Sequence, residues 1–152
     1  MNTNEHLKTS GKLRVDIFDQ HGNLKERREI PNLVVNTGLG YIASRMKDAT
    51  ATVMSHMAVG SDNTAAAAAN TALGTELGRV ALDSTTITGS NNEQVVYVAT
   101  FPAGTGTGAV VEAGIFNAGS AGTMLCRTTF LVVNKDVNDT MQITWTITIA
   151  AA

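Results

Sequence analysis

Residues Gly108–Phe130, GAVVEAGIFNAGSAGTMLCRTTF, indicate the fold of this chain more clearly than any other stretch. Two segments are rich in branched and apolar side chains, as β-strands are: Ala109–Asn117, and Met124–Val133, which extends three residues past Phe130. Between them, Gly119–Gly122 consists only of glycine, serine and alanine, which favours a turn. The stretch therefore predicts a β-hairpin, and it contains no group of residues that could form a catalytic site.

A second clear strand is predicted downstream at Met141–Ile149, MQITWTITI. Apolar residues occupy every second position, and threonine or glutamine stands between them. Because side chains alternate across a strand, this pattern places one face in the core and leaves a threonine face outside. Trp145, at the centre of the apolar set, is predicted to be a core residue.

The N-terminal part of the chain predicts a further hairpin. Lys12–Phe18 has the same alternation, and the turn residues Gln20–Asn23 lead into Leu24–Ile30. Charges dominate this second segment, which is typical of an edge strand. Pro31 is expected to end it, because proline lacks the backbone donor that a sheet requires.

One helix is predicted among these strands, with Asn36 or Thr37 as its cap. Apolar residues then follow at helical spacing: Leu39, Ile42, Ala43 and Met46. Gly60–Gly78 is predicted to be a long ordered loop with a short helix at its five alanines. Further strands are predicted at Val53–Val59, Arg79–Thr88 and Gln94–Pro102.

Together these elements predict a mainly-β fold. Roughly eight strands with hairpin-length connections and one short helix are typical of a two-sheet antiparallel β-sandwich, of jelly-roll or Greek-key type. Residues 12–152 are expected to form this single domain. Residues 1–11 are polar, and they are either a flexible tail or an N-terminal arm that orders against a neighbouring subunit and buries Leu7.

Charge is distributed unevenly along the 152 residues, whose net charge is −2. Residues 1–50 hold 8 of the 11 Lys and Arg and 6 of the 13 Asp and Glu. The surface of the remainder must therefore be built mainly from threonine, serine, asparagine and glycine, with little repulsion to oppose self-association. This favours a subunit of an assembly over a free enzyme, and it gives no reason to expect nucleic acid or a membrane as partner.

The residues that most often carry chemistry are scattered. His6, His21 and His56 lack the short spacing of metal ligands, and Cys126 lies in an apolar strand. Gly104–Gly108, GTGTG, has strands on both sides, whereas a phosphate loop needs a helix after it. We therefore expect no catalytic residue, no metal, no cofactor and no small-molecule substrate.

Glu112 and Arg127 are the only charged residues of the opening hairpin. They could pair across the strands or at a subunit contact, but a solvated charge on each strand is the preferred interpretation, since register decides which faces they share. In Lys25–Glu29, KERRE, two acidic residues are interspersed among three basic ones, which favours a solvated edge over a nucleic-acid surface.

Six segments in order along residues 12–149 resemble small structural proteins of tailed-bacteriophage virions, a group that includes decoration (cement) and tail-fibre-like proteins. They are NLVVNTG at Asn32–Gly38, MAVG at Met57–Gly60, LGTELGR at Leu73–Arg79, EAGIF at Glu112–Phe116, GTMLCR at Gly122–Arg127 and ITWTI at Ile143–Ile147.

The resemblance implies a non-enzymatic protein on the outer surface of the phage head, assembled in the cytoplasm of a bacterial host. Such proteins form homodimers or homotrimers, bind the major capsid protein and stabilise the shell against the pressure of packaged DNA. A tail-fibre, collar or other tail-associated role is the alternative. Candidate capsid or subunit contacts are His6, Leu7, Lys8, Glu112 and Arg127.

Overall fold

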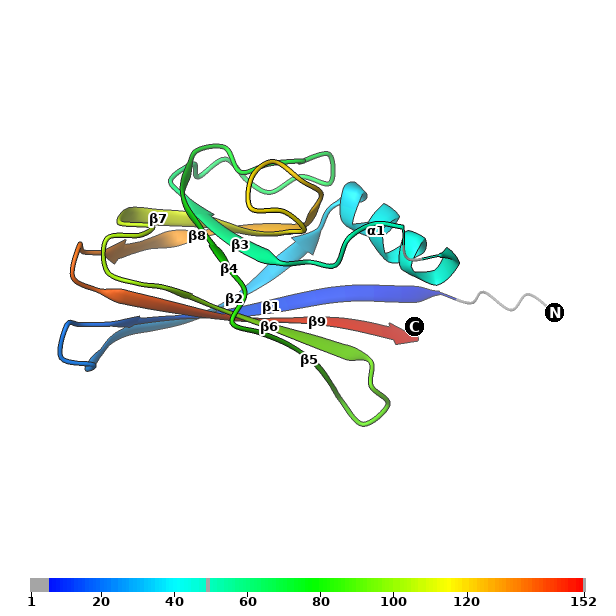
Figure 1. Cartoon of the computed structure of the whole chain (residues 1–152), viewed down its shortest axis with the longest axis horizontal. Helices are drawn as coiled ribbons and strands as arrows, with labels where there is room; N and C mark the ends of the chain where they lie inside the picture. Colours follow the sequence, from blue (N-terminus) through cyan, green and yellow to red (C-terminus); the bar gives the residue numbers. More distant parts are fainter. Residues whose placement is uncertain (1–5, 49, 152) are drawn as a thin grey trace.

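The structure, a computed structural model, describes residues 6–48 and 50–151. Within these ranges it contains nine strands and one helix (Figure 1). The strands are β1 (Leu7–Phe18), β2 (Leu24–Val34), β3 (His56–Gly60), β4 (Glu76–Ala81), β5 (Ser84–Thr88), β6 (Gln94–Phe101), β7 (Gly108–Phe116), β8 (Met124–Lys135) and β9 (Thr140–Ala151), and the helix is α1 (Asn36–Lys47). The mainly-β fold class is as predicted.

The strands form one antiparallel sheet in the order β4-β3-β7-β8-β2-β1-β9-β6-β5. Figure 1 shows this sheet folded into two layers, with β3, β4, β7 and β8 above β1, β9, β6 and β5. The strands at the two ends of the order, β4 and β5, are consecutive in the chain and joined only by Leu82 and Asp83. The sheet must therefore curl until its ends approach each other, which gives a half-barrel. The single strand predicted at Arg79–Thr88 is divided at this junction.

The core lies between the layers and follows the predicted alternation. Trp145 in β9 stands between Leu13 of β1 and Tyr97 of β6 in the sheet register. All three are buried, and Trp145 and Leu13 have no exposed surface. The apolar face of Met141–Ile149 is thus the centre of the core, as its sequence predicts.

β2 differs from the prediction in two respects. It is not an edge strand, because it lies between β1 and β8. It also continues past Pro31, which is opposite Lys12 of β1, to Leu33 and Val34, which pair with β8. Near the proline the strand leaves one layer and joins the other, and the Pro31 carbonyl oxygen accepts a hydrogen bond from the hydroxyl of Thr128 in β8 (2.7 Å).

Helix α1 forms where predicted but is oriented differently. Val35 occupies the N-cap position without a side-chain cap, and Thr37 instead donates its hydroxyl to the carbonyl oxygen of Met124 in β8 (2.7 Å). Gly38 is the buried residue of the helix, whereas Leu39 and Met46 are exposed. The close packing of Gly38 against the β8 backbone sets this orientation, so two residues expected in the core face solvent.

The N-terminal arm and the alanine-rich loop also need correction. Leu7–Gly11, predicted as part of an arm, belong to β1 and pair with Ala151–Ile147 of β9. Of the rest of the predicted arm, His6 is described and exposed, and residues 1–5 lie outside the described residues. The alanines of residues 65–69 lie in irregular backbone and a turn rather than in the predicted short helix.

Candidate assembly surface

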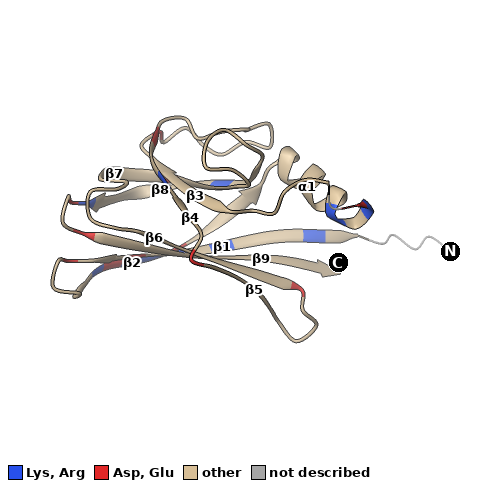
Figure 2. Ribbon diagram, viewed as in Figure 1, with Lys and Arg blue, Asp and Glu red and all other residues tan. Residues whose placement is uncertain are grey.

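Strands β5, β6 and β9 are neighbours in the sheet, and none of them contains a lysine, arginine, aspartate or glutamate. In Figure 2 the lengths of the three strands are tan and red appears only where they begin, next to Asp83, Glu93 and Asp139, whereas blue or red marks β1, β2 and the end of α1. Since charged side chains normally oppose edge and face association of a sheet, an uncharged area of three strands is the clearest candidate for a contact surface.

The outward side chains of these strands form rows across the sheet, which we call the outer face. Thr86, Val96 and Thr146 stand in one row of the register. The rows on either side are Ser84–Val98–Thr144 and Thr88–Gln94–Thr148. Hydroxyl and small branched groups of this kind can pack against another surface without burying a charge.

The outer face ends at β1 and β2, where charges are paired. Asp16 is almost fully buried, and its carboxylate accepts hydrogen bonds from Nε of Arg14 (3.1 Å) and Nε of Arg27 (2.6 Å). The hydrogen bond that Arg27 donates to Asp16 raises the pKa of Arg27. Lys12 and Glu29 form a further ion pair (2.8 Å). Three basic side chains meet two acidic ones here, so the border of the outer face keeps a small net positive charge.

A buried ion pair lies in the opposite layer. Nε and Nη2 of Arg127 donate to Oε2 of Glu112 (3.0 and 2.9 Å), and neither residue is more than 2% exposed. The Glu112 carboxylate also accepts backbone N–H groups from Asp62, Gly74 and Thr75, at 2.9 to 3.2 Å. Each charge is therefore compensated, as buried charges must be.

This geometry decides between the alternatives that the sequence left open. Glu112 and Arg127 pair across the β7–β8 hairpin, and the preferred interpretation of two solvated charges is wrong. Nη1 of Arg127 also donates to Oδ1 of Asn70 (3.0 Å), so the pair holds residues 61–75 on the sheet. Because both side chains are enclosed within the chain, they offer no surface for a capsid or subunit contact.

The other candidate contacts lie together at the start of β1. His6, Leu7 and Lys8 are exposed, and Leu7 has 72% of its surface accessible. Leu7 and Lys8 pair with Ala151 and Ala150 of β9. Their role in contacts stays a prediction.

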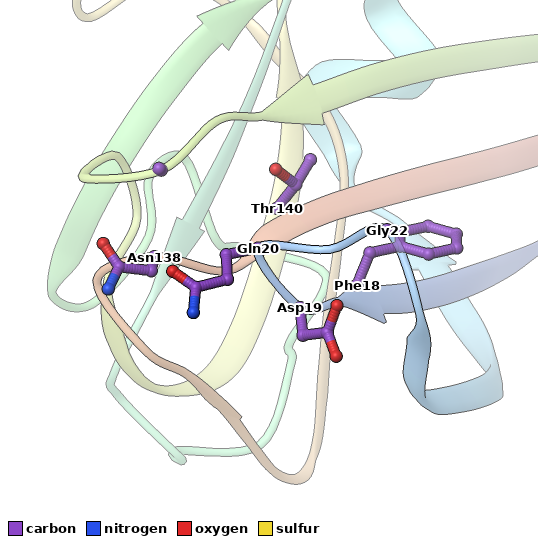
Figure 3. Close-up of a pocket in the computed structure, with 7 residues that line it drawn as sticks. Phe18, Asp19, Gln20, Gly22, Asn138 and Thr140 are labelled. Carbon is purple, nitrogen blue, oxygen red and sulfur yellow. The ribbon is translucent and has the colours of Figure 1, made fainter.

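A pocket of about 560 Å³ lies at the opposite end of the layers, among three connections (Figure 3). It is lined by Phe18, Asp19, Gln20, Gly22, Ala103, Asn138 and Thr140. Asp19 accepts the backbone N–H groups of His21 (2.8 Å) and Asn23 (2.9 Å), and these hydrogen bonds, that from Asn23 first, lower its pKa. The one carboxylate of the pocket is thus used to hold its own turn.

A smaller, mainly apolar pocket of about 380 Å³ separates α1 from the inner side of β5, β6 and β9. Its lining includes Tyr41, Ile42, Met54, Ile87, Val95 and Ile147. The pocket opens beside the edge of the sheet, where Ile87 is 57% exposed.

The residues considered for chemistry remain apart. Nδ1 of His56 contacts the hydroxyl of Ser55 (2.8 Å), and His21 lies in the β1–β2 turn. Cys126 is fully buried, and burial raises the pKa of its thiol. Among residues 6–48 and 50–151, no three histidine, cysteine or acidic side chains gather as metal ligands would.

The basic residues of the β2 segment are engaged with partners rather than gathered into a free surface. Lys25 contacts Asp139 (2.7 Å), and Arg28 donates to the carbonyl oxygens of Leu131 and Val132. The prediction that the neighbouring acidic residues cancel this charge agrees with the short contact of Arg28 with Glu26.

Comparison with models of known families, with curated proteins and with solved structures gives no match. Within the described ranges, α1 is too short and too polar to cross a bilayer.

Proposed function

We propose that the chain is a structural protein of a tailed-phage virion that decorates the outside of the head. It binds the major capsid protein there and stabilises the shell against the pressure of packaged DNA. The observation that carries the proposal is the outer face, an uncharged area of threonine, serine and valine over β5, β6 and β9. The resemblance of residues 12–149 to phage decoration proteins supplies the identity of the partner.

The rest of the molecule suits a load-bearing subunit. Glu112 and Arg127 fix the long loop to the β7–β8 hairpin, and β2 connects the two layers through continuous chain. A body with such internal ties transmits force without large rearrangement, since packed interiors resist deformation. Many copies on one shell act together, so a weak contact per copy is sufficient.

Copy number in the purified virion tests the location. A count comparable with that of the major capsid protein is expected for a decoration protein. A handful of copies, found with tail components, would overturn the proposal in favour of the tail-fibre or collar alternative. Specific binding of a host surface glycan by the purified protein would also favour the tail-fibre or collar alternative.

The role of the outer face is tested by binding of variants to empty capsids. Val96→Glu places a carboxylate at the centre of the face, between Thr86 and Thr146, and we expect binding to weaken by about tenfold or more because a charge buried without a partner is costly. Thr71→Glu, on the exposed loop of the other layer, is the matched control and should bind as the wild type does. Equal affinity of both variants would exclude the outer face as the attachment surface.

A further inference from the structure

Strand β5, STTIT, ends the strand order of the described sheet with only one side paired. Four of its five residues, Ser84 to Ile87, are exposed. A strand in this position presents unpaired backbone N–H and C=O groups, which are a template for another strand.

The register shows which backbone groups are unpaired. Ile149 of β9 donates its N–H to the carbonyl oxygen of Glu93 (2.9 Å), so the backbone groups of Glu93 face β9. In an antiparallel sheet, consecutive residues direct these groups to opposite neighbours. Val96 and Val98, at odd spacing from Glu93, therefore face β5, and Asp83 indeed donates its N–H to the Val98 carbonyl oxygen (2.7 Å).

It follows that β5 uses alternate residues on its two sides. Thr86 is opposite Val96 and forms the ladder with β6, as do Ser84 and Thr88 with their partners. Thr85 and Ile87 direct their N–H and C=O groups to the open edge.

The open edge of β5 lacks the features by which sheet edges usually avoid pairing. It contains no charge, no proline and no bulge in its pairing with β6. β4, at the other end of the order, differs because it contains Glu76 and Arg79, which form an ion pair (2.8 Å). Pairing is therefore favoured at β5.

We propose that β5 pairs antiparallel with β5 of a second copy of this chain, around a two-fold axis at Thr86. In this register Thr85 of each copy is opposite Ile87 of the other, and the two pairs exchange four backbone hydrogen bonds. Asp83 falls opposite Gly89, so no like charges meet. The uncharged sequence is thus complementary to itself, as an interface with two-fold symmetry requires.

The dimer has two consequences for the surfaces described above. The outer faces of the two copies become one continuous uncharged face. The apolar pockets, each lined by Thr85 and Ile87, also come to lie next to each other, so that the partly exposed Ile87 gains an apolar neighbour. This inference selects the dimer from the two oligomers that the resemblance implies. Its test uses purified protein alone, so it and the capsid proposal can fail separately.

Oxidative cross-linking tests the register. Thr86 would face its own counterpart at a non-hydrogen-bonded position, where Cα atoms lie about 4.5 Å apart, a separation that a disulfide can bridge. Thr86→Cys should therefore give a covalent dimer on mild oxidation. Thr88→Cys, on the same face but opposite Ser84, is the matched control and should cross-link far less. Equal cross-linking of both variants would overturn the register.

Sedimentation equilibrium tests the edge itself. The wild type should be dimeric, whereas Thr85→Pro should be monomeric with an unchanged thermal midpoint, because proline is tolerated where the N–H faces outward. Ile87→Lys, which adds a charge at an exposed edge position, should also be monomeric. It tests the edge even if the proline variant misfolds. A monomeric wild type, or a folded Ile87→Lys variant that stays dimeric, would refute the proposal.

Discussion

Arg127 donates two hydrogen bonds to a single carboxylate oxygen of Glu112, and both residues are enclosed within the protein. The second carboxylate oxygen accepts the backbone N–H groups of Asp62 and Thr75. One ion pair thus joins strands β7 and β8 to a loop that begins some 50 residues earlier in the sequence. The loop lacks regular secondary structure. Its backbone N–H groups therefore find their hydrogen-bond acceptor in the Glu112 carboxylate instead of in a neighbouring strand.

Removal of one partner should be strongly destabilising. Arg127→Ala leaves the Glu112 carboxylate buried without its counter-charge, and we expect a loss of about 3–5 kcal/mol in the free energy of unfolding. Urea unfolding of the variant and wild type measures this loss. Amide hydrogen exchange at Gly74 and Thr75 should also accelerate, because the carboxylate that accepts their N–H groups is perturbed.

The exposed ion pair of Lys12 and Glu29 provides the control. Their side chains are 63% and 54% accessible, so Lys12→Ala should cost less than about 1 kcal/mol. If Lys12→Ala and Arg127→Ala lower the free energy of unfolding by similar amounts, burial does not determine how much an ion pair contributes to the stability of this protein.

Trp145 allows a second prediction, because its indole Nε1 is buried and has no hydrogen-bond partner among the described residues. Trp145→Ala removes the largest fully buried side chain and should cost about 3–5 kcal/mol. Trp145→Phe should cost clearly less, since it retains an aromatic ring and removes the unsatisfied donor. Thermal and urea unfolding of the two variants check the order. Wild-type stability of Trp145→Ala would show that this face of β9 is not core.

The alternation of Met141–Ile149 was sufficient to predict β9 and its buried face, because strand periodicity is a local property of the sequence. The β7–β8 hairpin was equally predictable from its turn residues. The absence of charge in β5, β6 and β9 is also visible in the sequence. That these strands are neighbours is not, since pairing between distant segments depends on the whole topology.

The sequence-based predictions that the structure contradicts have one physical origin: contacts between residues that are distant in the sequence. The charges of β2 suggested an edge, yet Arg28 finds carbonyl oxygens on β8, more than 100 residues away. The sequence favours solvated charges at Glu112 and Arg127, because the residues among 61–75 that contact them follow no local pattern. Pro31 predicts a strand end, although a strand that changes layers can accommodate the missing backbone donor there.

Asp139 provides a prediction about pH. It is almost fully buried, and the hydrogen bond from Lys25, together with the N–H of Asp136, lowers its pKa. A carboxyl group with a depressed folded-state pKa stabilises the fold above its unfolded value, about 3.9, and this contribution is lost as pH falls toward the folded pKa. The free energy of unfolding of Asp139→Asn should therefore be lower at neutral pH and should decline less steeply below about pH 4.

Asp136→Asn is the matched control for this slope, because Asp136 is 76% accessible and lies farther from Lys25 (3.3 Å). It should retain the wild-type decline in acid. If Asp139→Asn declines as steeply as the wild type, Asp139 does not contribute to the acid sensitivity of the fold.

Two glycines in the first turns of α1 give the sharpest comparison, since only one of them touches the sheet. A Cβ at Gly38 would meet the backbone carbonyl of Leu125, whereas a Cβ at Gly40 would meet nothing within 4 Å. Gly40→Ala should stabilise the protein by about 0.5–1 kcal/mol, through helix propensity and reduced freedom of the unfolded chain. Gly38→Ala gains the same propensity but forces α1 away from β8, so we expect a net loss of about 1–3 kcal/mol. Urea unfolding separates the two outcomes, and equal stabilisation by both alanines would mean that α1 is not packed on β8 through Gly38.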